Sequence, residues 1–334
     1  MPHILIGGRI HQTGLDLLRA TPGVTFDMVD DMTAPATLPL LQKTDAILVR
    51  TQRLEGALLD QAQNLKILSR HGVGYDSVDI NALNRRHIPL CVVGDANSIS
   101  VAEHTLMLIL ALAKRVRAYD QQTRAGNWSY RDSQEAVELY GKTLLVVGFG
   151  RIGRAVAKRA AAFGMRIDVL DPFADRTEIL NVGAIAVENL IDALPRADIL
   201  SVHIPQAGDK ALINAEELAV MKPSALLINT ARGGIINEAA LATALNEGRI
   251  GGAGLDVFET EPPLHTHPLF SHDRAILTPH AAGLTKECAM RMSSMAAQNI
   301  LDFFSGRLDP ALVVNRIHAV LAPPEVCSAH LEKN

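Results

Sequence analysis

The stretch Thr143-Leu-Leu-Val-Val-Gly148-Phe-Gly150-Arg-Ile-Gly153 decides the fold of this chain. Its apolar half predicts a buried β-strand, its glycines predict a tight turn, and the residues that follow, as far as Phe163, have a helical pattern. The next apolar run, 167–170, is followed directly by Asp171. A strand, a glycine turn, a helix, a second strand and an acidic residue in this order form the fingerprint of a dinucleotide-binding domain.

The three glycines have separate predicted roles. Gly148 allows the tight turn, Gly150 lets the backbone approach a pyrophosphate, and Gly153 lets the helix pack closely against the strand. The backbone N–H groups at the start of the helix, together with the helix dipole, then face the phosphates. The alternative is a tight strand–helix turn that binds no ligand.

Asp171 distinguishes between two cofactors. Its carboxylate can accept hydrogen bonds from the ribose hydroxyls of NAD and repels the 2′-phosphate of NADP, so the sequence predicts NAD (NADH) as the preferred cofactor. Arg176 lies close enough in sequence to weaken this preference. The alternative is that Asp171 only caps the turn that runs to Asp175.

Composition limits the class of protein. A chain of 334 residues suggests two domains. A net charge of −4 without any basic block argues against nucleic-acid and membrane partners, and the longest apolar stretch, 106–113, is too short to span a bilayer. The N-terminus has the pattern of a first β-strand and not of a secretion signal. The three scattered cysteines, Cys91, Cys288 and Cys327, indicate a reducing compartment, and we expect a cytoplasmic protein.

Short apolar runs alternate with helical patterns along most of the chain, which predicts an α/β fold with parallel sheets covered by helices. The first series has predicted strands at 4–6, 25–29, 46–49, 66–68 and 89–93, and predicted helices at 15–19, 54–62 and 78–86. The second series has predicted strands at 144–147, 167–170, 184–187, 199–203, 226–229, 254–257 and 276–277, and predicted helices at 216–221 and 238–246. The two series predict two doubly wound parallel-sheet domains, one formed by residues 1–98 with 285–334 and one by residues 99–284.

Two longer helices are predicted where the series meet. The segment 99–118 is apolar nearly all round and must be buried on several sides. This favours a homodimer in which the helix packs against its own domain and a second subunit; the alternative is a buried linking helix in a monomer. A second helix is predicted at 286–304, after which the chain returns through 311–315 to complete the first domain. The tail from residue 322 is expected to be loosely held.

Three polar residues, Arg232, Glu261 and His280, stand at or just beyond the carboxyl ends of predicted strands. Ligands bind at that edge of an open α/β sheet, so we expect the three side chains to meet in one cleft. Arg232 has the planar fork that binds a carboxylate, and His280 is an acid or base near neutral pH. Glu261 would orient the imidazole and stabilise its protonated form. With a hydride from NADH, this set suits reduction of a 2-keto acid. Taken singly, each residue also has an ordinary interpretation as a surface or loop side chain.

These stretches closely resemble the D-isomer-specific 2-hydroxyacid dehydrogenase family. The matching sequences, besides the glycine turn, are Asn229-Thr-Ala-Arg-Gly-Gly234, Gly254-Leu-Asp-Val-Phe-Glu-Thr-Glu-Pro262, Thr278-Pro-His280, His71-Gly-Val-Gly-Tyr-Asp-Ser-Val-Asp79 and Ser100-Val-Ala-Glu-His104. The resemblance covers residues 4 to about 315. It implies an enzyme that transfers a hydride between NAD(H) and a small D-2-hydroxy acid. It also implies a flavodoxin-like substrate domain, a Rossmann NAD-binding domain and an active-site cleft between them.

The resemblance also implies roles for individual residues. Arg232, Glu261 and His280 would form the catalytic triad, with His280 as the proton donor and Arg232 binding the substrate. Asp256 would contact the nicotinamide end of the cofactor. The implied cofactor-binding positions are Gly148, Gly150, Arg151, Ile152, Gly153, Asp171, His203, Ile204, Pro205, Thr230, Ala231, Asp256 and Gly283, and the implied substrate-binding positions are Arg50, Val73, Gly74, Asn97 and Arg232.

Within that family, this sequence most resembles the phosphoglycerate dehydrogenase-like members. Arg50 falls where those enzymes contact the substrate and could recognise a phosphate, a sulfonate or a second carboxylate; the alternative is a strand-end arginine that faces water. Glyoxylate, hydroxypyruvate, phosphoglycerate and sulfolactate all suit such a pocket. The regulatory domain of longer members is not expected, nor feedback through it. One departure follows Pro205, where Gln-Ala-Gly replaces the Leu-Thr of many relatives and alters the expected cofactor contacts.

The sequence leaves other functions open. A phosphite-oxidising relative and an NADH-sensing binding protein share the fold and the cofactor, whereas formate enzymes of the family carry an amide where this chain has Glu261. A metal site at His265, His267 and His272 lacks an acidic or thiol partner at ligand spacing, so no metal is expected. His104 is interpreted as a polar contact of its helix.

Overall fold

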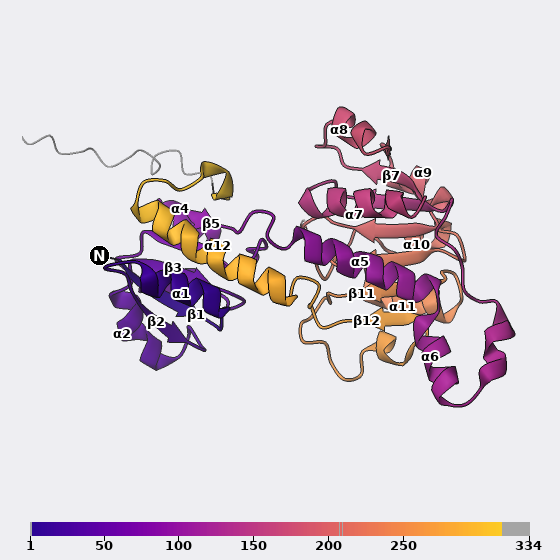
Figure 1. The fold of residues 1–334 in the computed structure, drawn as a ribbon, viewed down its shortest axis with the longest axis horizontal. Helices are drawn as coiled ribbons and strands as arrows, with labels where there is room; N and C mark the ends of the chain where they lie inside the picture. Colours follow the sequence, from indigo (N-terminus) through magenta and orange to yellow (C-terminus); the bar gives the residue numbers. More distant parts are fainter. Residues whose placement is uncertain (1, 207, 209, 316–334) are drawn as a thin grey trace, which may run out of the picture. The chain divides into compact units, whose positions relative to one another are not determined.

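The structure is a computed structural model of the chain, and it describes residues 2–206, 208 and 210–315. The chain divides into two compact units (Figure 1). Unit 1 comprises Met1–Asn97 and Lys286–Asn334, and unit 2 comprises Ser98–Thr285. Each unit contains one parallel β-sheet covered by helices, so the predicted α/β fold with two parallel sheets is confirmed.

Unit 1 has a five-stranded sheet in the order β2-β1-β3-β4-β5, which is the flavodoxin-like order. Its strands are β1 (His3–Gly7), β2 (Thr25–Val29), β3 (Ala46–Val49), β4 (Ile67–Arg70) and β5 (Leu90–Cys91). Its helices are α1 (Gln12–Ala20), η1 (Pro35–Thr37), α2 (Leu38–Gln42), α3 (Gly56–Leu59), α4 (Ile80–Arg85), α12 (Lys286–Phe304) and η5 (Pro310–Leu312). All five predicted strands of the first series are present.

Helix α12 completes unit 1 from the far end of the chain. It lies beside α1 (Figure 1) and contacts the sheet through the hydroxyl of Ser69, which donates to the carbonyl of Ala296 over 2.8 Å. The chain then passes along the edge of β5, where the N–H of Val314 donates to the carbonyl of Leu90 over 2.9 Å. The predicted return through 311–315 is therefore confirmed, while the tail from residue 322 lies outside the described residues.

Unit 2 has a seven-stranded sheet in the order β12-β11-β10-β9-β6-β7-β8, a Rossmann order with one strand added. Its strands are β6 (Thr143–Val147), β7 (Arg166–Leu170), β8 (Ile185–Ala186), β9 (Ile199–Val202), β10 (Leu226–Asn229), β11 (Gly252–Leu255) and β12 (Ala275–Leu277). Its helices are α5 (Ser98–Ala113), α6 (Val116–Arg124), η2 (Trp128–Ser133), α7 (Arg151–Ala162), α8 (Arg176–Asn181), α9 (Leu190–Ala193), η3 (Leu194–Arg196), α10 (Ala215–Val220), α11 (Glu238–Asn246) and η4 (Pro268–Ser271).

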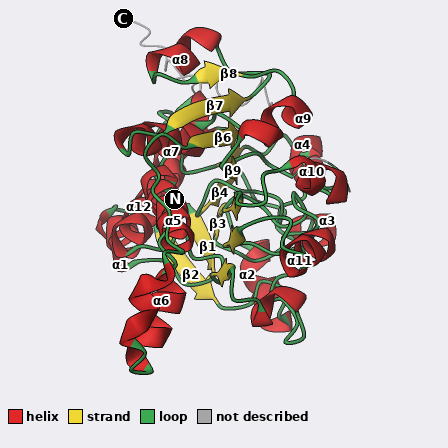
Figure 2. Ribbon diagram, turned by 90° about the vertical axis from the view of Figure 1, so that its right-hand side faces the viewer, coloured by secondary structure: helices red, strands yellow, loops and turns green. Residues whose placement is uncertain are grey.

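Alternate residues of the strands of unit 2 face two separate cores. Leu144 and Val146 of β6 face a core shared with α5 and α7, whereas Leu145 and Val147 face a core shared with α10 and α11. Figure 2 shows these two helix layers on opposite sides of the strands. Both faces of the sheet are covered, which explains why strands such as β6 and β10 are continuous apolar runs without alternation.

The segment 99–118 forms two helices, so the prediction of one helix was wrong. Helix α5 ends at Ala113, and the chain turns at Arg115, whose φ of 53° lies in the left-handed region. Helix α5 packs on its own unit, against α7 and the strands β10 to β12. It approaches the sheet closely because Gly254 has no side chain: a Cβ there would lie 3.0 Å from the Cβ of Leu108. Much of the apolar surface of α5 is therefore buried within unit 2.

In the part of the chain that the structure describes, no helix combines the length and the apolar character needed to cross a bilayer.

Candidate active site

The glycine turn joins β6 to α7, and its three glycines are in different surroundings. Gly148 has a φ of 94°, and a Cβ on it would lie 2.7 Å from the carbonyl oxygen of His203. A Cβ on Gly153 would lie 2.0 Å from the carbonyl oxygen of Gly148. Gly150 has no atom within 4 Å of a built Cβ and is exposed. Packing among the described residues thus requires glycine at two of the positions and leaves room for a side chain at Gly150.

Open space at Gly150 fits a dinucleotide pyrophosphate. Gly150 is the residue that precedes the first turn of α7, and the backbone N–H groups of Arg151 and Ile152 follow it at the start of that helix. The N-terminus of a helix of this length carries unsatisfied donors and a partial positive charge. The donor set and the missing side chain therefore suit an anionic group at this position.

Asp171, directly after β7, is fixed by hydrogen bonds to both of its carboxylate oxygens. Its Oδ2 atom accepts from the N–H of Phe149 over 2.7 Å, and its Oδ1 atom accepts from the N–H of Phe173 over 2.8 Å. The second bond caps the turn, as the alternative interpretation expected, and the first bond ties the carboxylate to the glycine turn. Arg176 forms an ion pair with Glu188.

The segment that follows β9 packs against the same turn. The Nε2 atom of His203 lies 2.9 Å from the hydroxyl of buried Ser201, and burial lowers the pKa of the imidazole to about 4. His203 is therefore neutral at physiological pH, and Ile204 and Pro205 come directly after it. A Cβ on Gly148 would lie 2.7 Å from a methyl carbon of Ile204, which places this segment beside the glycine turn.

Arg232, Glu261 and His280 follow the neighbouring strands β10, β11 and β12. The Nδ1 atom of His280 lies 2.7 Å from Oε2 of Glu261, and both side chains are partly exposed. The N–H of Phe258 donates to the other oxygen, Oε1 of Glu261, over 3.1 Å. Because Nδ1 faces the carboxylate, the other ring nitrogen is left to exchange a proton with a reactant.

Arg232 lies on the connection next to that of Glu261. Its NH1 group donates to the carbonyl of Ala231 over 2.6 Å. The next residue, Gly233, touches the connection after β11, because a Cβ there would lie 1.8 Å from the carbonyl oxygen of Phe258. Only glycine allows this contact, which joins the connection that carries Arg232 to the one that carries Glu261.

Asp256 organises the loop that bears His280. Its buried carboxylate accepts from the hydroxyl of Thr278 over 2.5 Å and from the N–H groups of Ala281 and Ala282 over 2.8 Å each. Its carbonyl accepts from the N–H of His280 over 2.7 Å. These four bonds hold His280 at a φ of 51°, a left-handed conformation that is uncommon for residues other than glycine. Gly283 lies in the same loop, directly after Ala282.

The interpretation of His104 as a polar contact of its helix agrees with the structure. Its Nε2 atom lies 2.9 Å from the hydroxyl of Thr278 and 3.6 Å from Oδ1 of Asp256. A neighbouring pair of hydroxyls, those of Thr105 and Thr230, lie 2.9 Å apart. The N–H of Ala231 donates to the side chain of Asn229 over 2.9 Å, so the residues before Arg232 are fixed as well.

The substrate-binding candidates other than Arg232 belong to unit 1. Arg50 follows β3, and its N–H donates to the carbonyl of Gly7 over 3.1 Å. Val73 and Gly74 follow β4 and are half-buried, and Asn97 is the last residue of this part of the unit. Arg50, Val73 and Gly74 therefore stand at the carboxyl-end edge of the parallel sheet, where such sheets bind ligands.

Three residues of unit 2 near this site were not singled out as site residues from the sequence. Glu238, Glu259 and His267 form a hydrogen-bonded group beside Phe258. The sequence suggests His267 only as a metal ligand, whereas its Nε2 atom lies 2.7 Å from Oε2 of Glu238. Among the described residues, no group of three or more His, Cys, Asp or Glu side chains is arranged to hold a metal ion.

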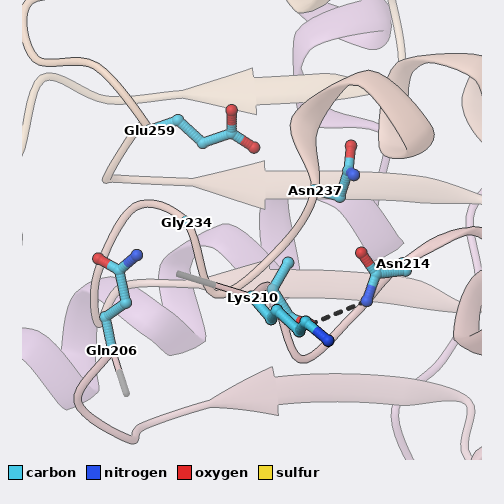
Figure 3. A pocket seen from close by; sticks show the side chains of 7 residues that line it. Gln206, Lys210, Asn214, Gly234, Asn237 and Glu259 are labelled. Carbon is cyan, nitrogen blue, oxygen red and sulfur yellow. Dashed lines mark hydrogen bonds between the residues drawn. The ribbon is translucent and has the colours of Figure 1, made fainter. Parts of the chain in front are cut away.

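A hollow of about 560 Å³ lies next to these residues (Figure 3). Its described lining residues are Gln206, Lys210, Ala211, Asn214, Gly234, Asn237 and Glu259. Two of its amides have structural partners: Asn214 caps α10, and Asn237 accepts from the N–H of Ala240 at the start of α11. Arg232, Glu261 and His280 are not among the lining residues, so this hollow is separate from the His280–Glu261 pair.

Comparison with known proteins gives a consistent result. The pattern of the D-isomer specific 2-hydroxyacid dehydrogenase NAD binding domain matches residues 106–282. D-3-phosphoglycerate dehydrogenase of Mycobacterium bovis is 39% identical over 94% of this chain and 59% of its own length. The chain spans between 50% and 59% of the length of such curated relatives.

Solved structures are similar over nearly their whole length. A protein from Thermus thermophilus superposes with a TM-score of 0.84 at 33% identity, covering 92% of this chain and 98% of that one. An NADPH-dependent glyoxylate/hydroxypyruvate reductase from Sinorhizobium meliloti superposes with a TM-score of 0.81 at 31% identity, covering 91% and 95%.

Proposed function

Because this chain belongs to the D-isomer specific 2-hydroxyacid dehydrogenase family, we propose that it transfers a hydride between NAD(H) and a small D-2-hydroxy acid or its 2-keto counterpart. The observation that carries the proposal is the 2.7 Å contact between Nδ1 of His280 and Oε2 of Glu261, which follow β12 and β11 at the same carboxyl-end edge of the sheet as the glycine turn. An oriented imidazole of this kind is the acid–base group that such a reaction requires.

Each member of the triad has one task in the proposed mechanism. Arg232 binds the carboxylate of the keto acid and polarises its carbonyl. His280 gives a proton to the carbonyl oxygen as charge develops there, and Glu261 holds the imidazole and stabilises its protonated form. NADH, when bound, supplies the hydride to the carbonyl carbon. The backbone N–H groups of Val73 and Gly74 would bind the substrate carboxylate.

The cofactor is proposed to lie along the glycine turn. Gly150, Arg151 and Ile152 would hold the pyrophosphate, and Asp171 would bind the ribose hydroxyls. The remaining proposed contacts are Asp256 at the nicotinamide end, Thr230, Ala231 and Gly283 beside the cofactor, and His203, Ile204 and Pro205 in the adenine pocket. A preference for NAD over NADP is supported by the carboxylate of Asp171, which is fixed beside the turn by its bond from Phe149. The relative from Sinorhizobium meliloti is NADPH-dependent, so cofactor choice is a property of the individual chain.

The proposed substrates are phosphoglycerate-, hydroxypyruvate- or glyoxylate-like acids. Support comes from the relatives, which are D-3-phosphoglycerate dehydrogenases and a glyoxylate/hydroxypyruvate reductase. Arg50 and Asn97 are proposed as further substrate contacts, with Arg50 recognising a second anionic group. We also propose a cytoplasmic location, for which the few scattered cysteines are the support.

We further propose a homodimer in which the segment 99–118 and the adjoining α6 and η2 face the second subunit. No residue of α6 or η2 is buried, and Trp128 is 69% exposed. Figures 1 and 2 both show α6 extending away from the sheet of unit 2. A hollow of about 390 Å³ there is lined by Tyr119, Gln122, Thr123, Asn127, Trp128, Tyr130 and Arg131. Aromatic side chains of this exposure are typical of protein interfaces.

Sedimentation of the Trp128→Ser variant tests this interface. The molecular mass should shift towards that of the monomer, and a mass equal to that of wild type would contradict the proposed interface.

A spectrophotometric panel tests the proposed activity. NADH oxidation is followed by its absorbance with glyoxylate, hydroxypyruvate, phosphohydroxypyruvate and sulfopyruvate, and NAD⁺ reduction is followed with phosphite. We expect turnover of at least one keto acid and none of phosphite. Tight NADH binding without turnover of any compound would indicate a sensing protein, and turnover of phosphite alone would indicate a phosphite-oxidising relative.

A further inference from the structure

Glu238 and Glu259 form a reciprocal pair that ties the start of α11 to the connection after β11. The N–H of Glu238 donates to Oε1 of Glu259 over 2.9 Å, and the N–H of Glu259 donates to Oε1 of Glu238 over 2.6 Å. Glu238 is the first residue of α11 and is 7% exposed, so its carboxylate also lies at the favourable end of the helix dipole. We name this arrangement the carboxylate pair.

His267 is hydrogen-bonded to the carboxylate pair. Its Nδ1 atom accepts from the N–H of Leu269 over 3.3 Å, so its proton resides on Nε2, which donates to Oε2 of Glu238 over 2.7 Å. The imidazole and the carboxylate are both nearly buried. The ring also packs edge-on against Phe258, with the centroids 5.5 Å apart, and lies beside Phe270 at 5.3 Å. His267 therefore contacts the start of its own connection twice, reaching Glu259 through Glu238 and Phe258 through its ring.

The connection held in this way is the one that orients Glu261. Glu259 of the carboxylate pair follows directly after Phe258, whose ring touches His267. The N–H of Phe258 donates to Oε1 of Glu261, while Oε2 of the same carboxylate faces Nδ1 of His280. Displacing Phe258 would therefore rotate the carboxylate that aligns the imidazole.

We propose that Glu238, Glu259 and His267 are positioning residues that fix Phe258 so that Glu261 presents its second oxygen to His280. The inference rests on the proposed function, since it assigns them a part in the proton transfer by His280. They touch neither substrate nor cofactor in this account. A displacement of about 1 Å in a catalytic group can cost roughly 10²-fold in rate, so an effect on kcat is expected from residues outside the reacting set.

Substitutions at His267 separate positioning from packing. His267→Phe keeps a ring between Phe258 and Phe270 but leaves Oε2 of Glu238 without its donor. His267→Gln can supply an N–H to that oxygen. His265→Phe is the matched control, because His265 is an exposed histidine in the same connection.

The experiment measures kcat and KM for the best keto acid of the panel, well below the melting temperature of each variant. We expect kcat to fall about 10-fold or more in His267→Phe, with KM and the Kd of NADH within about twofold of wild type. His267→Gln should recover most of the lost kcat, and His265→Phe should match wild type. A His267→Phe variant with wild-type kcat, or equal losses in His267→Phe and His267→Gln, would overturn the inference.

A second readout does not depend on turnover. The imidazole ¹H and ¹⁵N resonances of His280, assigned with His280→Ala, report its contact with Glu261. We expect His267→Phe to shift these resonances and His265→Phe to leave them in place. If wild type turns over no keto acid, the proposed function fails, whereas this spectrum still decides the positioning of Glu261. Unshifted resonances in His267→Phe would overturn the inference even in an active enzyme.

Discussion

The imidazole of His280 is bonded through Nδ1 to Oε2 of Glu261 over 2.7 Å, while Oε1 of the same carboxylate accepts from the N–H of Phe258. The carboxylate thus has one oxygen anchored to the backbone and one directed at the imidazole. This pair is the acid–base element of the proposed mechanism.

The Glu261→Gln variant tests the charge of that pair. Glutamine keeps an oxygen for the N–H of Phe258 but removes the negative charge that stabilises a protonated imidazole. We expect kcat for keto acid reduction to fall about 10-fold or more, and to decline with rising pH from a lower pH than in wild type. Steady-state rates across the neutral pH range provide the measurement. Superimposable pH profiles would show that Glu261 does not act on His280.

The glycine turn offers a matched comparison. A Cβ on Gly150 meets no atom within 4 Å, whereas a Cβ on Gly153 would lie 2.0 Å from a backbone oxygen. Gly150→Ala should therefore leave the unfolding free energy of the ligand-free protein unchanged but weaken NADH binding about 10-fold or more, because the methyl group occupies the pyrophosphate position. Gly153→Ala should lower the unfolding free energy by about 1–3 kcal/mol. Urea unfolding and NADH titration measure both. Unaltered NADH affinity in Gly150→Ala would place the cofactor elsewhere.

Cofactor choice is tested at Asp171. Asp171→Asn keeps one acceptor oxygen for the N–H of Phe149 or that of Phe173, and it removes the charge that repels a 2′-phosphate. The ratio of kcat/KM for NADH to that for NADPH should fall about 10-fold or more, which corresponds to about 1.4 kcal/mol. Initial rates with both cofactors give the ratio. A ratio equal to that of wild type would mean that Asp171 serves only to cap its turn.

The buried imidazole of His71 should make the stability of unit 1 depend on pH. Burial lowers the pKa of His71 to about 4, and Arg50 and Arg70 act in the same direction. In the unfolded chain the pKa is about 6.5, so the unfolded state binds a proton that the folded state excludes. The contribution of His71 to the unfolding free energy should be fully present above about pH 6.5. As the pH approaches 4, protonation of the unfolded chain should lower the unfolding free energy by about 3 kcal/mol.

His71→Asn isolates that contribution. Urea unfolding at about pH 7 and pH 4.5 measures how far the unfolding free energy of wild type and of the variant falls on acidification. The variant should lose less stability on acidification than wild type does. An equal loss in both proteins would show that His71 is not the group responsible.

The sequence predicts the strands well and the break between α5 and α6 poorly. The central strands, such as β1, β3, β6 and β10, are short apolar runs, because both faces of a covered parallel sheet are buried. The break occurs at Lys114-Arg115, where no glycine or proline marks it, and Arg115 takes a φ of 53°. A left-handed arginine is uncommon, and Arg115 pairs with Glu135, 20 residues further along the chain; periodicity reports neither feature.

The candidate site was predictable in its main residues and not in their supports. Arg232, Glu261 and His280 stand at strand ends, and a parallel sheet brings such ends to one edge. Glu238 and Glu259 are 21 residues apart, and His267 is 29 residues from Glu238. They lie at a helix start and in connections, positions where a Glu or His is commonly solvated. Only the folded structure shows that their side chains are bonded to one another.

The measurement that tests the central claim most directly compares His280→Ala with wild type. Both proteins are titrated with NADH and then assayed for reduction of the preferred keto acid. The account predicts the same Kd for NADH and a loss of kcat of about 10²-fold or more, since the proton donor alone is removed. A His280→Ala variant that retains near wild-type turnover would contradict it.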